Sequence, residues 1–512
     1  MHAPDRSANQ PNQHVPRRSG ADPGGGAKVT VLTGGRVIDP ANGLDAVADV
    51  VCADGRIVAV GPGAGAAYMS LSIPAPSVTA APSAAWRAVD VIDCAGLLVT
   101  PGLIDLHVHV YPGLGDFCVH PDRAGVEVGV PVVVDGGTSG VRTLGISRAF
   151  AQSPAVRTRV LALMDPCLLY LATKDFIAHR LEIANDLRNL DLDAAAAAVE
   201  EHKDYVVGFK VRATTTQDDR VSPFLEGAKS IAGNLPIMIH LGKYPYTKSL
   251  SNLDALAALR PGDIVTHALR GHSGALVNDG TAVHPVFADA VARGVRLDVG
   301  HSGSDFRFAA ARALLDLGYP PHTISTDLNL FNEDGPVYSL PETMSKIWSL
   351  GVGLPDVIAM ATVNSAASIR RSHELGSLGV GRAAEVSVLR VDEGPVAFSD
   401  GFETIAGERR LAPVGCLRGG TWIEATGPFS AASRAASRAA GEAGRGSDGG
   451  EAGDSGEAPG GLPRRRAGVA AAEAAAESLI YQRGTAGGAG AASAVGAPVS
   501  GGLGSRDVEA TR

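Results

Sequence analysis

The sequence has few of the features that mark membrane or secreted proteins. Its 512 residues contain no apolar run of about 18 residues, the length that a membrane-spanning helix needs. Arg17 and Arg18 near the N-terminus are followed by no apolar stretch, so neither a secretory nor a twin-arginine signal is predicted. The five cysteines include no CxxC pair and are odd in number, which argues against a disulfide framework. We therefore expect a cytoplasmic protein without a membrane partner.

Features of nucleic-acid-binding proteins are also scarce. Aromatic residues make up 5% of the chain, the formal net charge is −9, and the one compact basic run, residues 464–466, lies in a low-complexity segment. No nucleic-acid partner is expected. Charged residues make up 19% and hydrophobic residues 45%, which is typical of a soluble globular enzyme. A small-molecule substrate is the expected partner, and a homo-oligomer is compatible with the sequence.

Composition and periodicity divide the chain into segments. Residues 1–27 and the Ala/Gly/Ser-rich tail 428–512 are predicted to be disordered, because they have too little apolar side-chain surface to bury. Residues 28–100 and 375–427 contain short strands and turns, and we expect them to form one small β-sandwich domain from both chain ends. Within the first of these segments, residues 63–86 are predicted to be a flexible insertion.

Residues 101–374 alternate apolar, strand-like runs with helical patterns. There are eight runs, spaced about 25 to 45 residues apart, which predicts an α/β fold with a closed (β/α)₈ TIM barrel. A doubly wound open sheet is the alternative. The runs are residues 103–110, 130–134, 160–163, 205–211, 237–241, 263–266, 295–299 and 323–325.

Residues able to bind metal ions follow these runs in phase. His107 and His109 end the first run, and their i, i+2 spacing places both imidazoles on one face of a strand. The remaining candidates stand near the ends of the fourth, fifth, sixth and eighth runs. The carboxyl ends of parallel barrel strands meet at the catalytic mouth, so we expect one cluster there. Its members are His107, His109, Lys210, His240, His267 and Asp327.

Imidazoles with a carboxylate and no thiolate suit Zn²⁺, and other divalent ions are compatible. Lys210 does not fit as a simple ligand, because an ammonium repels metal ions. One alternative is a buried lysine paired with a carboxylate; the other is a lysine carbamylated by CO₂, which bridges two metals. Two ions would share a hydroxide and polarise a substrate carbonyl. Asp327 would then act as general base and acid.

The stretch from Val99 to His109 closely resembles the opening strand of the amidohydrolase superfamily. Five further stretches resemble its dihydroorotase-like amidohydrolase/deacetylase branch: residues 208–212, 239–242, 263–267, 298–303 and 324–328. The resemblance implies a binuclear centre in each subunit, bridged by carbamylated Lys210. It assigns one ion to His107, His109 and Asp327, and the other to His240 and His267.

Three further residues are predicted to contact the substrate. Arg212 lies two residues after Lys210 and, on a regular strand, points to the same side, where its guanidinium would pair with a carboxylate; an internal ion pair is equally compatible. Tyr111 is in phase with His109 and would line the mouth or pack in the core. His301 ends the seventh run between Gly300 and Gly303, and is a candidate for a substrate contact or an oxyanion stabiliser.

These residues predict a hydrolase of amide or ester bonds (EC 3.5 or 3.1 type). Its substrate would be small, acylated and carboxylated, so the expected activity is deacetylase-like. A dihydroorotase-like hydrolase of cyclic amides is the alternative within the same mechanism. A non-catalytic scaffold with the same fold is the alternative from another class, and the complete ligand set argues against it.

Overall fold

The computed structural model describes residues 28–70, 88–174, 176–215, 220–241, 248, 250–271, 277–278 and 282–435. The predicted disordered segment 1–27, most of the predicted insertion and most of the tail lie outside these ranges. Where the insertion is described, helix α1 (Ala64–Ser70) forms, which the sequence did not predict; the flexibility of the insertion stays a prediction. Within the described ranges, no helix has the length and apolar character needed to cross a membrane.

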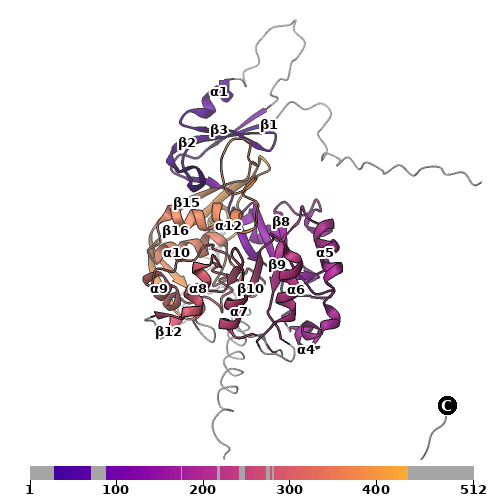
Figure 1. Cartoon of the computed structure of the whole chain (residues 1–512). Coiled ribbons are helices and arrows are strands. Elements are labelled where there is room, and N and C mark those ends of the chain that lie inside the picture. The colour runs from indigo at the N-terminus through magenta and orange to yellow at the C-terminus, as the bar shows by residue number, and fades with distance from the viewer. Residues whose placement is uncertain are drawn as a thin grey trace, which may run out of the picture. The chain divides into compact units, whose positions relative to one another are not determined.

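Seven parallel strands form the central sheet, in the order β14-β11-β10-β9-β8-β7-β6. Figure 1 labels β8, β9 and β10 of this sheet. Each overlaps one of the first seven apolar runs expected from the sequence. The strands are β6 (Ile104–Val108), β7 (Val132–Gly140), β8 (Arg159–Asp165), β9 (Val206–Val211), β10 (Ile237–His240), β11 (Ile264–Thr266) and β14 (Arg296–Leu297).

The eighth run joins the two edges of this sheet. Thr323 makes a parallel bridge to Asp298, just after β14, and Leu328 makes a parallel bridge to Val108 at the end of β6. The amide of Asp327 also donates to the carbonyl of His107 at 2.6 Å. An open doubly wound sheet has no such link between its edge strands. The fold is therefore TIM-barrel-like, as the spacing of the runs predicted.

Helices follow the barrel strands, and several begin where the sequence supplies a capping residue. The side chain of Ser222 accepts from the amide of Leu225, and Pro223 occupies the first turn of α6. The helices are α2 (Pro121–Ala124), α3 (Leu144–Ala151), α4 (Ile177–Arg180), α5 (Leu192–Glu201), α6 (Pro223–Ala232), α7 (Asn252–Ala258), α8 (Pro285–Ala292), α9 (Phe308–Asp316), α10 (Leu340–Ser349), α11 (Leu354–Met360) and α12 (Val363–Ser368), with 3₁₀ turns η1 (Pro40–Asn42), η2 (Val126–Val128), η3 (Ile183–Asn185) and η4 (Leu187–Asn189).

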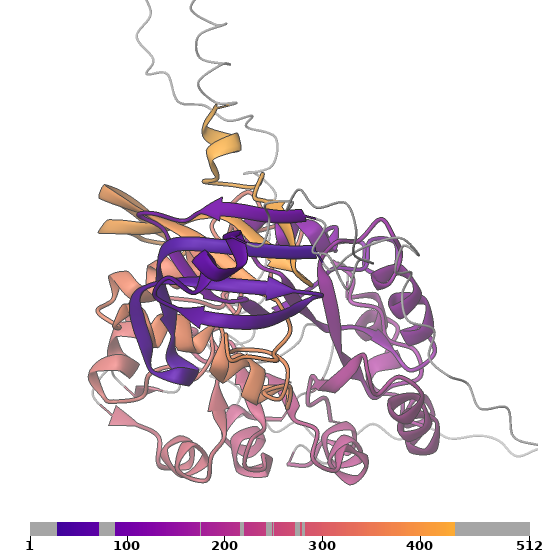
Figure 2. The same ribbon diagram turned by 90° about the horizontal axis from the view of Figure 1, so that it is seen from above.

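A second sheet combines strands from both ends of the chain, in the order β17-β16-β15-β5-β1-β2-β3, with β4 paired to β1 (Figure 2). β5 connects the two halves, because it pairs with β1 on one side and with β15 on the other. The predicted union of the chain ends is thus present as one hydrogen-bonded sheet, whereas the two layers of a sandwich remain a prediction. The strands are β1 (Lys28–Asp39), β2 (Leu44–Ala53), β3 (Arg56–Gly61), β4 (Ala88–Asp93), β5 (Leu98–Pro101), β15 (Val386–Ser399), β16 (Thr404–Arg418) and β17 (Thr421–Glu424).

A separate two-stranded sheet pairs β12 (Val277–Asn278) with β13 (Ala282–Val283).

An apolar cluster fills the space between the barrel strands. Six strands contribute at least one buried residue each, as expected for the packed interior of a barrel. The contributors include Ile104, Val132, Leu161, Val207, Met238 and Ile264. The polar residues singled out above lie further along the same strands, towards their carboxyl ends. The cluster therefore forms the base on which the candidate site is built.

Candidate metal centre

Three of the predicted ligands converge at the carboxyl end of β6. The Nε2 atoms of His107 and His109 lie 3.3 and 3.1 Å from the same oxygen of Asp327, Oδ1. One ligand atom from each residue falls within 4.8 Å of the other two, and all three residues are buried. The sequence placed Asp327 more than 200 residues after the histidine pair, and closure of the barrel brings them together.

Hydrogen bonds on the other side of each ring determine which nitrogen carries the proton. The Oγ1 of Thr138 donates to Asp135 at 2.7 Å, so it accepts from Nδ1 of His109 at 2.8 Å. In the same way Thr266 donates to Asp298 at 2.8 Å and accepts from Nδ1 of His107 at 3.0 Å. Both imidazoles therefore carry their proton on Nδ1 and turn the lone pair of Nε2 towards Asp327.

This arrangement fits a bound cation. Two imidazole lone pairs and a carboxylate oxygen face one another at 3.1 to 3.3 Å, which is unfavourable unless a positive charge lies among them. Asp327 Oδ1 is buried and has no hydrogen-bond partner in the described part of the chain. The close approach therefore brings two acceptor nitrogens to an acceptor oxygen and is not an ion pair. Three such ligands suit a divalent metal ion.

A second group of ligands borders the first. The ring of His267 lies 5.2 Å from that of His107 and 4.4 Å from that of His240, centroid to centroid. Nδ1 of His267 donates to the carbonyl of Gly300 at 2.7 Å, because a carbonyl only accepts. Its Nε2 is buried, has no hydrogen-bond partner among the described residues, and lies 4.0 Å from Oδ2 of Asp327. Nε2 of His267 is therefore an available acceptor beside the His107, His109 and Asp327 group.

Lys210 lies between the two groups on β9. Its Nζ is 2.7 Å from Nε2 of His107, so the unmodified amine donates into the lone pair that would bind a metal. Burial, followed by the charge of Arg212, lowers the pKa of Lys210 to about 7. A large fraction of the amine is then neutral near pH 7, and only the neutral amine can react with CO₂. These properties match the carbamylation alternative better than a permanent ion pair.

The backbone around the site is specialised in two ways. His267 and Asp327 have positive φ angles of 61° and 53°, a conformation that few non-glycine residues adopt and that often occurs at functional sites. Gly136 in β7 leaves room for the ring of His107, which a Cβ at that position would overlap. A Cβ at Gly300 would likewise overlap Thr266. These glycines are required by close packing of the ligands and their supports.

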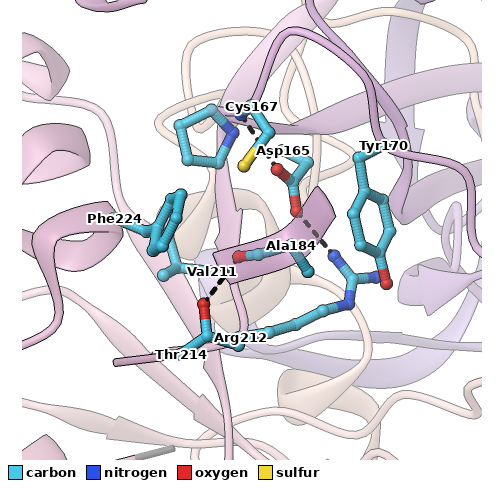
Figure 3. Close-up of a pocket in the computed structure, with 9 residues that line it drawn as sticks. Asp165, Cys167, Tyr170, Ala184, Val211, Arg212, Thr214 and Phe224 are labelled. Atoms are coloured by element: carbon cyan, nitrogen blue, oxygen red, sulfur yellow. Dashed lines mark hydrogen bonds and ion pairs between the residues drawn. The ribbon is translucent and has the colours of Figure 1, made fainter. Parts of the chain in front are cut away.

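Arg212 forms an ion pair inside the protein. Its Nη1 lies 2.8 Å from Oδ2 of Asp165, both side chains are buried, and its guanidinium lies 3.9 Å from the centroid of the Tyr170 ring (Figure 3). The adjacent cavity, lined also by Phe224 and Thr214, measures about 10 Å³, which is room for about one water molecule. The internal ion pair that the sequence left open is thus present, and a substrate carboxylate would have to compete with it.

Tyr111 and His301 also have partners within the protein. Tyr111 is buried in the hydrophobic core and its hydroxyl bonds that of Tyr205 at 2.5 Å, so of the two alternatives the structure shows core packing. His301 is fully buried, and its Nε2 lies 2.8 Å from Nζ of Lys346. Its Nδ1 accepts from the amide of Gly303 at 3.1 Å. Neither ring nitrogen of His301 faces substrate in this structure, so the predicted catalytic contact would require Lys346 to move.

The residues that orient the ligand histidines were not predicted from the sequence. Asp135 and Asp298 are fully buried and act through Thr138 and Thr266. Thr266 directly precedes the predicted ligand His267. The sequence does show an aspartate near the end of an apolar, strand-like run. Which ligand that aspartate supports becomes known only when the strands are assembled into the barrel.

Comparisons with known proteins identify the family of this chain. The model of the amidohydrolase family matches residues 98–407. A deacetylase of Agrobacterium fabrum is 32% identical over 363 residues, which cover 70% of this chain and 82% of that protein. A deacetylase of Brucella anthropi is 31% identical over 373 residues, 72% and 85% of the two chains.

Solved structures show the same fold. An adenine deaminase matches with a TM-score of 0.64 and 25% identity, covering 77% of this chain and 99% of its own. A dihydroorotase matches with a TM-score of 0.62 and 27% identity, covering 78% and 98%. Given the ligand cluster and these relatives, the chain belongs to the amidohydrolase family of metal-dependent hydrolases.

Proposed function

We propose that the protein is a binuclear hydrolase that removes an acyl group from a small carboxylated substrate. The observation that carries the proposal is the buried convergence of His107, His109 and Asp327: both Nε2 atoms lie within 3.3 Å of Asp327 Oδ1, which has no hydrogen-bond partner among the described residues. A divalent cation would stabilise this set of acceptors.

The residues divide into two ligand groups. His107, His109 and Asp327 would hold one ion, and His240 and His267 the other, with carbamylated Lys210 between them. Zinc suits these nitrogen and oxygen ligands, and other divalent ions are compatible. Two bound ions supply Lewis acidity, which lowers the pKa of water and polarises a carbonyl.

Asp327 is suited to move the proton during hydrolysis. Its main chain is held by three contacts: its amide donates to His107, and its carbonyl accepts from Asn329 at 3.0 Å and Asn332 at 2.9 Å. Among the described residues, no donor forms a hydrogen bond with Oδ1 of its side chain. It can therefore take a proton from the attacking water and deliver it to the leaving group.

Acyl removal is favoured over ring opening by the relatives. The two deacetylases named above are similar along more than two thirds of this chain. A dihydroorotase of Citrifermentans bemidjiense is 45% identical, but over only 85 residues, 16% of this chain. Hydrolysis of a cyclic amide is the second candidate, supported by that match and by the dihydroorotase fold.

The bridging role of Lys210 gives the decisive test. In the variant Lys210→Ala we expect kcat/KM to fall by at least about 100-fold, because a shared ligand is lost. Metal content should fall below that of wild type, and added short-chain carboxylic acids should restore part of the activity. The assay uses zinc- and bicarbonate-supplemented protein with acylated amino acids, acetylated hydroxy acids and cyclic ureides.

A matched control removes a lysine elsewhere. Lys203 is exposed and pairs with Glu200, so Lys203→Ala should retain both metal and activity. Full metal content and full activity in Lys210→Ala would contradict the binuclear centre. Wild-type protein that binds less than about 0.3 equivalents of metal after supplementation would favour the non-catalytic scaffold.

A further inference from the structure

Asn332 connects two loops at the mouth of the barrel. It is 2% exposed, and its Nδ2 lies 2.8 Å from the carbonyl oxygen of Ser302, which follows the seventh strand-like run. The same atom lies 2.9 Å from the carbonyl oxygen of Asp327, which follows the eighth run. A carbonyl only accepts, so both N–H groups of the amide are used. Oδ1 of Asn332 accepts from the amide of Asn329 at 3.0 Å, which fixes the orientation of the side chain.

The two carbonyls belong to residues with unusual backbone conformations. Ser302 has a φ of 57° and Asp327 a φ of 53°, in the left-handed region that few residues with a side chain adopt. Such conformations persist where the surrounding structure holds them. The amide of Ser302 also donates to the carbonyl of Thr326 at 2.8 Å, so a further contact joins the same two loops. Asn332 thus helps to hold Asp327 in the conformation in which its carboxylate faces the ligand histidines.

The loop of residues 300–307, which contains Ser302, lies beside the hairpin of β15 and β16. Residues 386–389 of β15 pair with β5, whereas the pairing of β15 with β16 continues to Ser399. Beyond the sheet of joined chain ends, Phe398 and Leu411 of the hairpin are buried in one hydrophobic cluster with barrel residues. The hairpin therefore extends from that sheet onto the barrel.

The tip of this hairpin is bonded to the beginning of α9. Asp400 is fully buried, and its Oδ1 closes the turn by accepting from the amides of Phe402 and Glu403, each at 2.8 Å. Its Oδ2 accepts from the amide of Phe308, the first residue of α9, at 3.0 Å. The carboxylate of Asp400 therefore joins the hairpin turn to the end of the 300–307 loop.

The tip also packs against the 300–307 loop itself. Gly401 comes so close that a Cβ at this position would lie 2.6 Å from the carbonyl oxygen of Gly303, the residue after Ser302. At the other end of the loop, the guanidinium of Arg307 lies over the ring of Phe402. The hairpin tip thus restrains the loop on both sides of the carbonyl to which Asn332 donates.

We propose that the tip of the β15–β16 hairpin positions Asp327, with Asp400 and Asn332 as the positioning residues. Asp400 holds the 300–307 loop, the loop presents the carbonyl of Ser302, and Asn332 ties that carbonyl to the main chain of Asp327. The inference rests on the proposed function, in which Asp327 binds an ion and moves the proton. It adds that the placement of this carboxylate depends on a segment of the second sheet.

The variant Asn332→Ala removes both donated hydrogen bonds. We expect zinc affinity, measured by competition with a chelator dye, to fall about 10- to 100-fold, as when other groups that orient metal ligands are lost. With full-length, zinc-loaded protein and an acetylated amino or hydroxy acid, kcat should fall by a similar factor while KM changes less than about threefold. Asn332→Asp keeps the shape but presents an acceptor to a carbonyl. It should show the same losses, and it carries the test if Asn332→Ala does not fold.

The contribution of the hairpin is tested with Asp400→Asn. This variant keeps an oxygen for the turn but loses the acceptor for the amide of Phe308, so zinc affinity and kcat should fall by about tenfold. The double variant with Asn332→Ala should lose no more than about threefold beyond Asn332→Ala alone, because both residues act through one series of contacts. Losses that simply multiply would show that Asp400 does not act through Asn332.

Two matched controls remove similar groups elsewhere. Glu403→Gln removes a carboxylate from the same turn, where the side chain is exposed. Asn364→Ala removes an amide that donates at 2.9 Å to the carbonyl of His322, just before the eighth run. Both should keep zinc affinity and kcat within about twofold of wild type. Circular dichroism and the unfolding midpoint are measured for every variant.

The proposal is overturned if both Asn332 variants, or Asp400→Asn, keep the zinc affinity and kcat of wild type. If wild type binds zinc but hydrolyses no compound, the proposed activity fails, and zinc affinity alone decides. If wild type binds no zinc, the proposed metal centre fails, and crystal structures of wild type and Asn332→Asp decide. An Asp327 that leaves the positive-φ region in Asn332→Asp supports the proposal, and an unchanged Asp327 refutes it.

Discussion

Two threonines determine which ring nitrogen of the ligand histidines His107 and His109 carries the proton. Thr138 and Thr266 each donate to a buried aspartate and accept from Nδ1 of a ligand. A hydroxyl has one proton, so donation to the carboxylate leaves only its lone pairs for the imidazole. This single constraint turns Nε2 of His107 and His109 into acceptors, which a metal ligand requires.

Removal of the Thr138 hydroxyl should therefore weaken metal binding, although all the ligand side chains remain. For Thr138→Val we expect zinc affinity to fall about 10- to 100-fold, because the tautomer and orientation of His109 are no longer set. Competition with a metal-binding chelator dye measures the affinity. The control is Thr362→Val, which removes a buried hydroxyl bonded to Ile358 in α11. An unchanged zinc affinity in Thr138→Val would show that Thr138 does not set the tautomer.

At the scale of elements, β7 is adapted to the ligands that pack against it. Its burial is continuous over all nine residues, and its carboxyl half contains Gly136 and Gly137. A Cβ at Gly136 would overlap His107, and one at Gly137 would lie 2.5 Å from Cβ of Lys210. Because Gly136 and Gly137 have no side chains, β7 can approach His107 of β6 and Lys210 of β9 closely.

Gly136→Ala should displace His107 and abolish metal binding at the first site. We expect a loss of activity of at least about 100-fold, as for other supports of metal ligands. The matched control is Gly145→Ala in α3, where an added Cβ meets nothing within 4 Å. That change should preserve activity and raise stability by about 0.5 to 1 kcal/mol. Normal metal content in Gly136→Ala would mean that the strand can shift to accommodate the methyl group.

At the scale of the whole molecule, Glu385 lies where the sheet of joined chain ends meets the barrel. Its carbonyl accepts from the amide of Gly102, between β5 and β6, at 2.8 Å. Its side chain accepts from Arg418 at 3.1 Å through Oε1, while Oε2 is buried without a partner among the described residues. Burial raises the pKa of Glu385 from 4.5 to about 7. The junction therefore contains a carboxyl group that resists ionisation.

This raised pKa predicts the pH dependence of stability. Between pH 4.5 and 7 the folded state holds a proton that the unfolded state releases, so the unfolding free energy contributed by this group falls as pH rises. Glu385→Gln should remove this dependence and be more stable than wild type at pH 8, by at most about 3 kcal/mol. Urea unfolding in chelator at pH 4 and pH 8 measures it, with exposed Glu200→Gln as control. A difference from wild type that is equal at both pH values would contradict this assignment.

The fold followed largely from local patterns. Apolar runs such as residues 130–134 and 237–241 are short and regularly spaced, and each became a barrel strand. Strand phase also placed the histidines at one end of the barrel, because side-chain direction alternates along a strand. The helix at Ala64–Ser70 was missed because its alanines and glycines lack a period, and packing against β1 and β2 rather than sequence pattern supports it.

The sequence by itself determined which residues could serve as ligands and where along each strand they stand. The tertiary structure decided their partners. It paired Arg212 with Asp165, turned Tyr111 into the core and joined His301 to Lys346. Residue type and strand phase are local properties, whereas a hydrogen bond between strands depends on barrel closure, which no local segment specifies.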